Sequence, residues 1–155
     1  MKYLFAGAAA ALTIMVPAGA HAQDTPEALQ AAFVAAVEAE DATALGNLFT
    51  EDADSYSPGT HHVRGRAAVA ADWQGFFDAF DAISLTLDMH GSAGLGDSHA
   101  AWGEWTMSQT PAGGGDAFTL TGRFMDIQSR IDGRWYYRAD HASVSPAPPP
   151  APASE

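Results

Sequence analysis

The chain has 155 residues, no cysteine and a formal net charge of −12, with seven basic side chains against 19 acidic ones. The lack of cysteine excludes disulfides, thiol nucleophiles and thiolate metal sites. The acidic balance argues against nucleic acid and anionic lipid as partners, because both bind to cationic patches.

The first residues have the pattern of an export signal. Lys2 supplies a positive charge, an apolar stretch runs from residue 4 to 16, and Ala20-His21-Ala22 is a small-x-small cleavage site. A membrane anchor is the alternative, but the stretch is shorter than the roughly 20 residues that span a bilayer. We therefore expect residues 1–22 to be a cleaved signal peptide. The mature protein is then expected to be periplasmic or secreted, without membrane contact and without lysine.

Three helices are predicted after the signal. The first begins at Thr25-Pro26, because threonine caps helices and proline suits their first position, and it ends near Glu40. Asp41 is expected to cap a short second helix, and the third follows Gly65. Apolar side chains recur at helical spacing in all three. They are Leu29, Phe33 and Val37, then Leu45, Leu48 and Phe49, then Val69, Trp73, Phe76, Phe77 and Phe80.

The apolar period changes to two after Ile83, which indicates β-strands. Residues 57–60 are predicted to form a turn between two short strands upstream, and residues 110–116 a hairpin loop. In the strand over residues 99–108, Trp102 and Trp105 fall on opposite faces, so at most one points inward. Asp132-Gly133 predicts a type I′ turn between the last two strands. Residues 145–155 are rich in proline and alanine and are expected to form a disordered tail.

The last hairpin resembles the C-terminal hairpin of the SnoaL-like branch of the nuclear transport factor 2-like superfamily. The order of the upstream elements is similar too, so the resemblance covers one domain over residues 24–144. It implies an α+β cone, in which three N-terminal helices pack in a curved antiparallel sheet, and a homodimer through the outer sheet face. The cone usually holds a small apolar ligand. The matching residues are Arg123, Asp126, Asp132, Gly133, Trp135, Asp140, His141 and Ser143.

The histidine of this motif has two possible roles. On a regular strand His141 shares a face with Trp135 and Tyr137, while Asp140 points the other way unless a bulge intervenes. His141 is therefore either a hydrogen-bonded core residue or a pocket acid or base near neutral pH. Arg123 is similarly open between a structural ion pair with an aspartate and an anion-binding site.

The family's catalytic members offer a comparison at one position. In ketosteroid isomerase, which has the fold that the resemblance implies, the general base is an aspartate just before a proline, and the similar position here is Ser57, before Pro58. A serine without a neighbouring base does not abstract a carbon-bound proton at neutral pH. No metal site is predicted, because adjacent His61 and His62 point to opposite faces of a strand and no helical His-x-x-x-His pair exists.

These observations predict a binding protein for a small apolar molecule with a polar group, without cofactor or metal. The alternative is an enzyme of the isomerase, cyclase or hydratase type that uses His141 as acid or base. The aromatic residues have a second interpretation as plain core. The catalytic candidates are His141 and Asp54, and the ligand-binding candidates are Tyr56, Trp73, Phe77, Trp102, Arg123, Asp126 and Tyr137.

Overall fold

The computed structural model of the chain describes residues 23–58 and 62–146. The predicted signal peptide and nearly all of the predicted tail lie outside these residues, as does part of the predicted turn at residues 57–60. Within the described ranges, no helix is long and apolar enough to cross a membrane.

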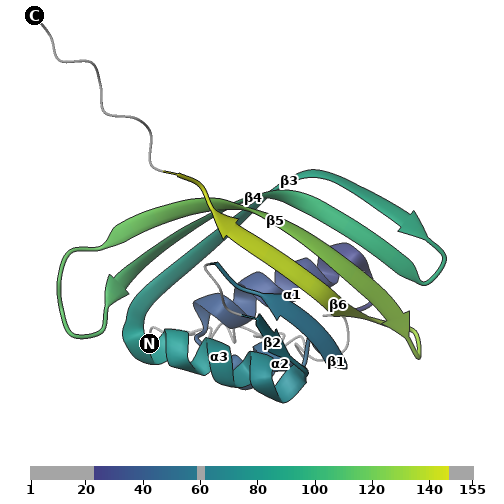
Figure 1. Cartoon of the computed structure of the whole chain (residues 1–155), viewed down its shortest axis with the longest axis horizontal. Coiled ribbons are helices and arrows are strands. Elements are labelled where there is room, and N and C mark those ends of the chain that lie inside the picture. The colour runs from purple at the N-terminus through teal and green to yellow at the C-terminus, as the bar shows by residue number, and fades with distance from the viewer. Residues whose placement is uncertain (1–22, 59–61, 147–155) are drawn as a thin grey trace, which may run out of the picture.

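Three helices and six strands occupy these described ranges (Figure 1). In chain order they are α1 (Pro26–Glu38), α2 (Ala42–Gly46), β1 (Phe49–Tyr56), β2 (His62–Arg64), α3 (Arg66–Ala79), β3 (Phe80–Leu95), β4 (Ser98–Pro111), β5 (Phe118–Ile131) and β6 (Arg134–Val144).

The strands form one curved sheet in the order β2-β1-β6-β5-β4-β3. Strands β3 to β6 are an antiparallel meander, as predicted, but β1 lies parallel to β6. The sheet is therefore mixed, and the expectation of a fully antiparallel sheet is wrong at this one pairing. Figure 1 shows the sheet arching over the helices. The α+β cone predicted from the sequence is confirmed.

The two predicted helix caps are present. Thr25 Oγ1 accepts a hydrogen bond from the Ala28 N–H at 3.1 Å, and Asp41 Oδ1 accepts one from the Ala44 N–H at 2.8 Å. Each bond satisfies a backbone donor that the first turn of a helix leaves unpaired. On α1, Leu29 and Val37 are fully buried, so the four-residue apolar spacing marks the face that packs inside the cone.

Helix α3 continues into the sheet without a loop. It ends at Ala79, β3 begins at Phe80, and the Phe80 N–H still donates to the Phe76 carbonyl oxygen. The change of direction is completed at Ala82, whose φ of 51° is positive. The strand therefore begins three residues before Ile83, the position where the apolar period changes.

The hairpin between β5 and β6 turns at Asp132 and Gly133, whose φ angles are 51° and 81°. Positive φ at both positions is what a type I′ turn requires, so this prediction is confirmed. The tight turn fixes which residues of β5 and β6 lie opposite each other near the turn.

The two tryptophans of β4 lie on opposite faces, as predicted. Trp105 is 7% exposed and points to the concave side, whereas Trp102 is 37% exposed on the outer side. The Trp105 ring lies against Gly122 of β5, where an added Cβ would overlap with the indole and with the Ser143 carbonyl oxygen. Glycine at this position therefore allows the indole to lie flat on the inner face of the sheet.

Candidate functional site

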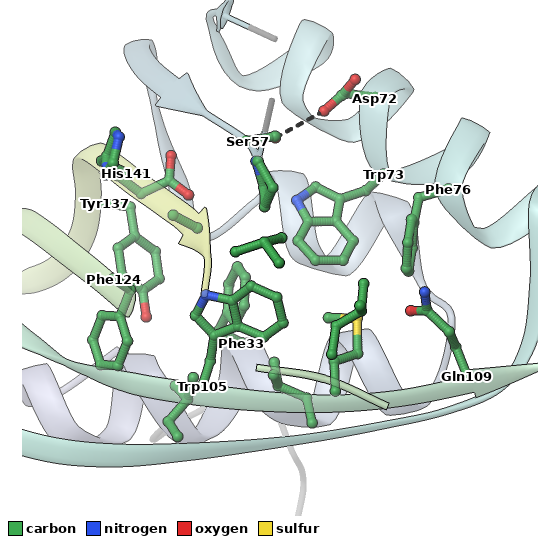
Figure 2. Close-up of a pocket in the computed structure, with 18 of the residues that line it drawn as sticks. Phe33, Ser57, Asp72, Trp73, Phe76, Trp105, Gln109, Phe124, Tyr137 and His141 are labelled. Atoms are coloured by element: carbon green, nitrogen blue, oxygen red, sulfur yellow. Dashed lines mark hydrogen bonds between the residues drawn. The ribbon is translucent and has the colours of Figure 1, made fainter. Parts of the chain in front are cut away.

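A cavity of about 580 Å³ is lined by the concave face of the sheet, one side of α3, one residue of α1 and the two residues that follow β1. Its volume falls within the range typical of small-molecule pockets, and its walls are mostly apolar. Figure 2 shows labelled aromatic rings arranged around it. The aromatic residues that line it are Phe33, Phe49, Trp73, Phe76, Phe80, Trp105, Phe124 and Tyr137.

The aromatic wall is held by edge-to-face contacts between neighbouring rings. Phe33 packs edge-on against Trp73 and against Tyr137, with ring centroids 5.6 Å apart in both pairs. Trp73 makes a third such contact with Phe76, also at 5.6 Å. Pairs of this kind contribute about 0.5–1.5 kcal/mol beyond their buried area. The rings are therefore fixed by one another, so the apolar surface of the cavity is preformed.

A β-bulge at Arg138 determines which residues of β6 face this cavity. Gln128 of β5 lies opposite Tyr137, but the next residue back, Ile127, lies opposite Ala139, so Arg138 is an extra residue. One extra residue inverts the alternation of faces beyond it. The expectation that His141 shares a face with Trp135 and Tyr137 is therefore wrong. Asp140 points inward instead, and the side chain of His141 is exposed.

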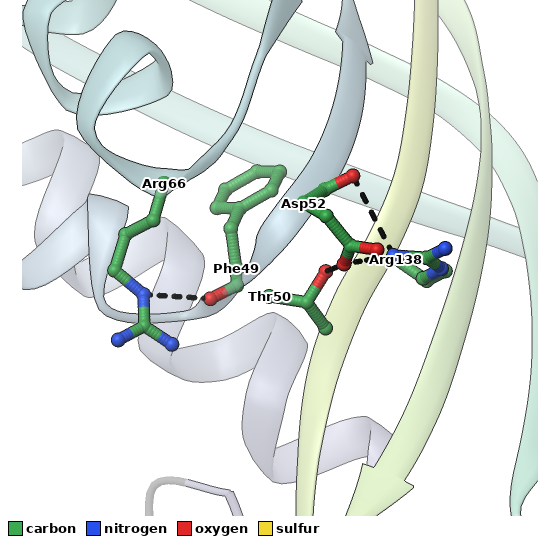
Figure 3. Close-up of polar contacts among 5 residues, drawn as sticks. All are labelled: Phe49, Thr50, Asp52, Arg66 and Arg138. Carbon is green, nitrogen blue, oxygen red and sulfur yellow. Dashed lines mark hydrogen bonds and ion pairs between the residues drawn. The ribbon is translucent and has the colours of Figure 1, made fainter.

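The extra residue, Arg138, contacts the neighbouring strand β1 through its side chain. Figure 3 shows the guanidinium of Arg138 in an ion pair with the carboxylate of Asp52, and it also donates to the Asp52 carbonyl oxygen at 3.5 Å. The Thr50 hydroxyl donates to the same carboxylate at 3.2 Å. The hydrogen bond from Arg138 lowers the pKa of Asp52. These contacts occur where the pairing of β1 with β6 is interrupted between Phe49 and Asp54.

The bulge brings two carboxyl groups together. Asp126 of β5 and Asp140 of β6 lie directly opposite each other and both line the cavity. Directly opposite residues on antiparallel strands have Cβ atoms about 4.5–5.5 Å apart. Burial raises the pKa of Asp126 well above its ordinary value, and the charge of Asp140 raises it further. Burial also raises the pKa of Asp140, to about 6.

Several neighbours limit these shifts. The Ser55 hydroxyl and the charge of His141 both favour the ionised form of Asp140, which lowers its pKa relative to burial alone. The Gln30 amide does the same for Asp126. Because Gln30 Nε2 makes no hydrogen bond of good geometry to a described residue, we take its effect on Asp126 to be electrostatic. At neutral pH, above its pKa of about 6, Asp140 carries a negative charge, while burial and this charge both favour the protonated form of Asp126.

Three buried polar atoms on the cavity wall have no hydrogen-bond partner among the described residues. They are Oδ1 of Asp140, Nε1 of Trp105 and Oε1 of Gln109. A buried polar atom without a partner costs about 1–3 kcal/mol, so such atoms are uncommon in folded proteins. Two of the three are acceptors and one is a donor.

A second polar position lies on the other side of the cavity. The Ser57 hydroxyl donates to Oδ2 of Asp72 on α3 at 3.2 Å, a bond drawn in Figure 2, and both residues line the cavity. The sequence-based comparison with the isomerase assumed a serine without a neighbouring base. Asp72 places a carboxylate beside Ser57, so that assumption is wrong.

The ligand-binding candidates fall in three places. Trp73, Asp126 and Tyr137 line the cavity. Phe77 is 5% exposed and belongs to the core next to it, where its ring contacts Trp73. The other three candidates, Tyr56, Trp102 and Arg123, are exposed, with Trp102 and Arg123 on the outer face of the sheet.

The two catalytic candidates lie at the edge of the site or beyond it. His141 contributes to the rim of the cavity, and its ring centroid is 6.4 Å from that of Tyr56. Asp54 contacts Nε2 of His62 at 2.9 Å on the exposed side of the sheet and does not line the cavity. Asp54 also does not pair with Arg123, which lies opposite Glu104 and Ser143 on the outer face. Their predicted catalytic roles stay predictions.

Polar residues of the site that were not among the candidates predicted from the sequence include Asp72, Trp105, Gln109 and Asp140. Asp140 was placed on the wrong face, because no glycine or proline marks the bulge at Arg138. Trp105 and Gln109 could have been recognised as a pair on one face of β4, since they are four residues apart on a strand. For metals, the described residues contain no group of three or more histidine or acidic side chains arranged to hold an ion.

The SnoaL-like domain family matches residues 31–138 of the chain, which therefore belongs to this family. No curated protein is significantly similar to it. Solved structures share the fold at low identity, and three of them illustrate the range.

A candidate scytalone dehydratase from Novosphingobium aromaticivorans is 15% identical, with a TM-score of 0.71 over 83% of this chain and 92% of that one. A nuclear transport factor 2-like superfamily protein from Salmonella enterica serovar Typhimurium is 19% identical, with a TM-score of 0.68 over 81% and 92%. A conserved protein from Planctomyces limnophilus is 21% identical, with a TM-score of 0.71 over 78% and 94%. At these identities the likeness establishes the fold alone.

The raised pKa of Asp140 predicts a pH dependence of stability. A carboxyl group whose folded pKa is above its unfolded value stabilises the folded state at low pH, and this contribution is lost as pH rises through about 6. We expect Asp140→Asn to raise the free energy of unfolding by about 2–3 kcal/mol at about pH 8 and by much less at about pH 4. Urea unfolding at both pH values measures this difference.

The matched control is Glu104→Gln, which removes one acid from the exposed outer face of β4. It should change stability little at either pH, because exposed charges interact weakly. Equal effects of the two variants at about pH 8 would contradict the assignment of a buried charge to Asp140.

Proposed function

We propose that this SnoaL-like domain binds a small, mostly apolar molecule in the cavity between the sheet and α3. The observation that carries the proposal is a preformed aromatic cavity of about 580 Å³ with unpartnered buried polar atoms on its wall. A few polar groups in an otherwise apolar pocket are typical of sites that orient a ligand. Trp73 and Tyr137 would contact the apolar body, and Asp126, Asp140 and Trp105 would contact its polar groups.

This proposal predicts that filling the cavity abolishes binding without unfolding the protein. Leu120 lies on the inner face of β5, where it is partly buried and lines the cavity. Leu120→Trp should reduce the affinity for the neutral apolar dye Nile red about tenfold or more, because the indole takes up space that the dye needs. Fluorescence titration measures the affinity, and circular dichroism checks the fold.

Leu95→Trp is the matched control, since Leu95 is 86% exposed at the end of β3. It should leave dye binding unchanged. If the wild-type protein does not bind the dye, or if both variants bind as well as the wild type, the cavity is not a binding site for apolar molecules.

Acid–base catalysis is the second candidate, and one observation favours it. Asp140 lies in the cavity with a pKa of about 6, close to the value that suits proton transfer near neutral pH. Burial raises the pKa of Asp126 beside it, which favours its acid form, so the pair places a base next to a potential acid. His141, the acid or base predicted from the sequence, lies at the rim of the cavity, and its charge lowers the pKa of Asp140.

A test of catalysis begins with the molecule that copurifies with the protein, identified by native mass spectrometry and organic extraction. If the domain is an enzyme, incubation with this molecule should yield a product of different mass or retention time. At saturating concentrations of this molecule, Asp140→Asn should slow the conversion at least a hundredfold, which is a typical loss for an acid–base group. A larger loss with His141→Gln than with Asp140→Asn would return the role to the histidine.

We further propose that the domain is a homodimer through the outer sheet face. One row of opposite residues crosses all six strands on this face, and it is largely aromatic and exposed. Packing two such faces together would remove its apolar side chains from water. In order from β2 to β3 the row consists of His62, Tyr56, His141, Met125, Trp102 and Gly91.

This proposal predicts a dimer that one charge in the row disrupts. Met125 is 56% exposed at its centre. Met125→Glu should convert the dimer to a monomer, because it buries a charge in a self-complementary interface. Light scattering coupled to size exclusion gives the mass. Leu95→Glu, at the tip of a hairpin away from the row, should remain dimeric, and a monomeric wild type would refute the interface.

A further inference from the structure

The charges that line the cavity are unbalanced. Besides Tyr137 and the exposed His141 at the rim, its titratable lining residues are carboxylic acids: Asp72, Asp126 and Asp140. None of the six arginines in the described residues lines it. Two of them are held elsewhere, Arg138 by Asp52 and Arg66 by the Phe49 carbonyl oxygen and Glu51. The cavity therefore has a negative wall and, among the described residues, no arginine or lysine to match it.

One carboxylate oxygen on this negative wall lacks a hydrogen-bond donor within the part of the chain that the structure describes. Oδ1 of Asp140 is shielded from solvent and accepts no hydrogen bond from a described residue. A buried carboxylate is strongly destabilising unless a cation or several donors face it. The protein supplies the Ser55 hydroxyl, backbone groups and the charge of the exposed His141 to this carboxyl, and the facing residue on β5 is another acid, Asp126. The missing partner is a donor that carries positive charge.

The rest of the cavity suits such a donor. Tyr137, next to the carboxyl pair, is 2% exposed, and other aromatic rings line the same space. The faces of aromatic rings attract cations, with contributions of about 0.5–2 kcal/mol each. An anionic ligand would instead face like charge in a low-dielectric space that no described arginine or lysine lines. Anions are therefore disfavoured by the same residues that favour a cation.

We propose that the ligand of this cavity is an apolar amine, whose protonated nitrogen binds between Asp140 and Asp126 while its apolar body packs on the aromatic wall. The inference rests on the proposed binding function and names its chemical class of ligand. The ammonium group would donate to Oδ1 of Asp140 and to the Asp126 carboxyl. Its charge would also favour the ionised form of Asp126, whose pKa is raised by burial.

The test compares three probes that share one ring system and differ in charge: 2-(1-naphthyl)ethylamine, 2-(1-naphthyl)ethanol and 1-naphthylacetate. Their affinities for the whole protein are measured by calorimetry at about pH 8, where the amine carries its proton. We expect the amine to bind at least tenfold more tightly than the alcohol, and the carboxylate to bind most weakly.

Two variants identify the residue responsible. Asp140→Asn should reduce the affinity ratio of amine to alcohol to about 1 while leaving alcohol binding unchanged, because only the charge is lost. Glu104→Gln removes one acid from the outer face and should keep the ratio of the wild type.

The outcomes separate this inference from the proposed function. Equal binding of amine and alcohol by the wild-type protein would overturn the amine proposal and leave the apolar binding site in place. A preference for the amine that survives Asp140→Asn and Asp126→Asn would also overturn it, because the charge would then act from elsewhere. Absence of binding for all three probes, together with absence of Nile red binding, would remove the binding function itself.

Discussion

The site depends on one extra residue in β6. Arg138 has no partner on β5, and the inversion of faces beyond it turns Asp140 toward Asp126 and turns His141 to the outside. Without the bulge, His141 and not Asp140 would face the cavity. The cavity would then hold only one carboxyl group at this position, that of Asp126. The contacts of Arg138 with Asp52 are exposed and hence weak individually. They nevertheless favour the register on which the chemistry of the site depends.

The carboxyl pair and the apolar residues around it affect each other's energetics. The residues packed around the two carboxyl groups bury them, and this burial raises the pKa of both acids. The acids in turn remain unsatisfied because the apolar wall offers them no donors. Such an arrangement lowers the stability of the empty protein, as buried charges at binding sites commonly do. A ligand that supplies the missing donor recovers this free energy as affinity.

Much of the fold followed from local patterns in the sequence. The caps at Thr25 and Asp41 and the turn at Asp132-Gly133 are determined by short-range geometry, so residue types alone identify them. The parallel pairing of β1 with β6 and the bulge at Arg138 are long-range features, set by contacts between segments more than 80 residues apart. No local pattern encodes them. For this reason Trp73, Asp126 and Tyr137 were placed at the cavity from sequence, while Asp140 was not.

The direct passage from α3 into β3 links the cavity to the outer face. Trp73 and Phe76 line the cavity from α3, and the same backbone continues without a loop into the strand that ends the sheet. A loop would absorb movement between the two, whereas a continuous backbone transmits it. Any contact that changes the curvature of β3 would therefore move part of the aromatic wall. Assembly on the convex side and occupancy of the concave side would then be thermodynamically linked, each altering the equilibrium constant of the other.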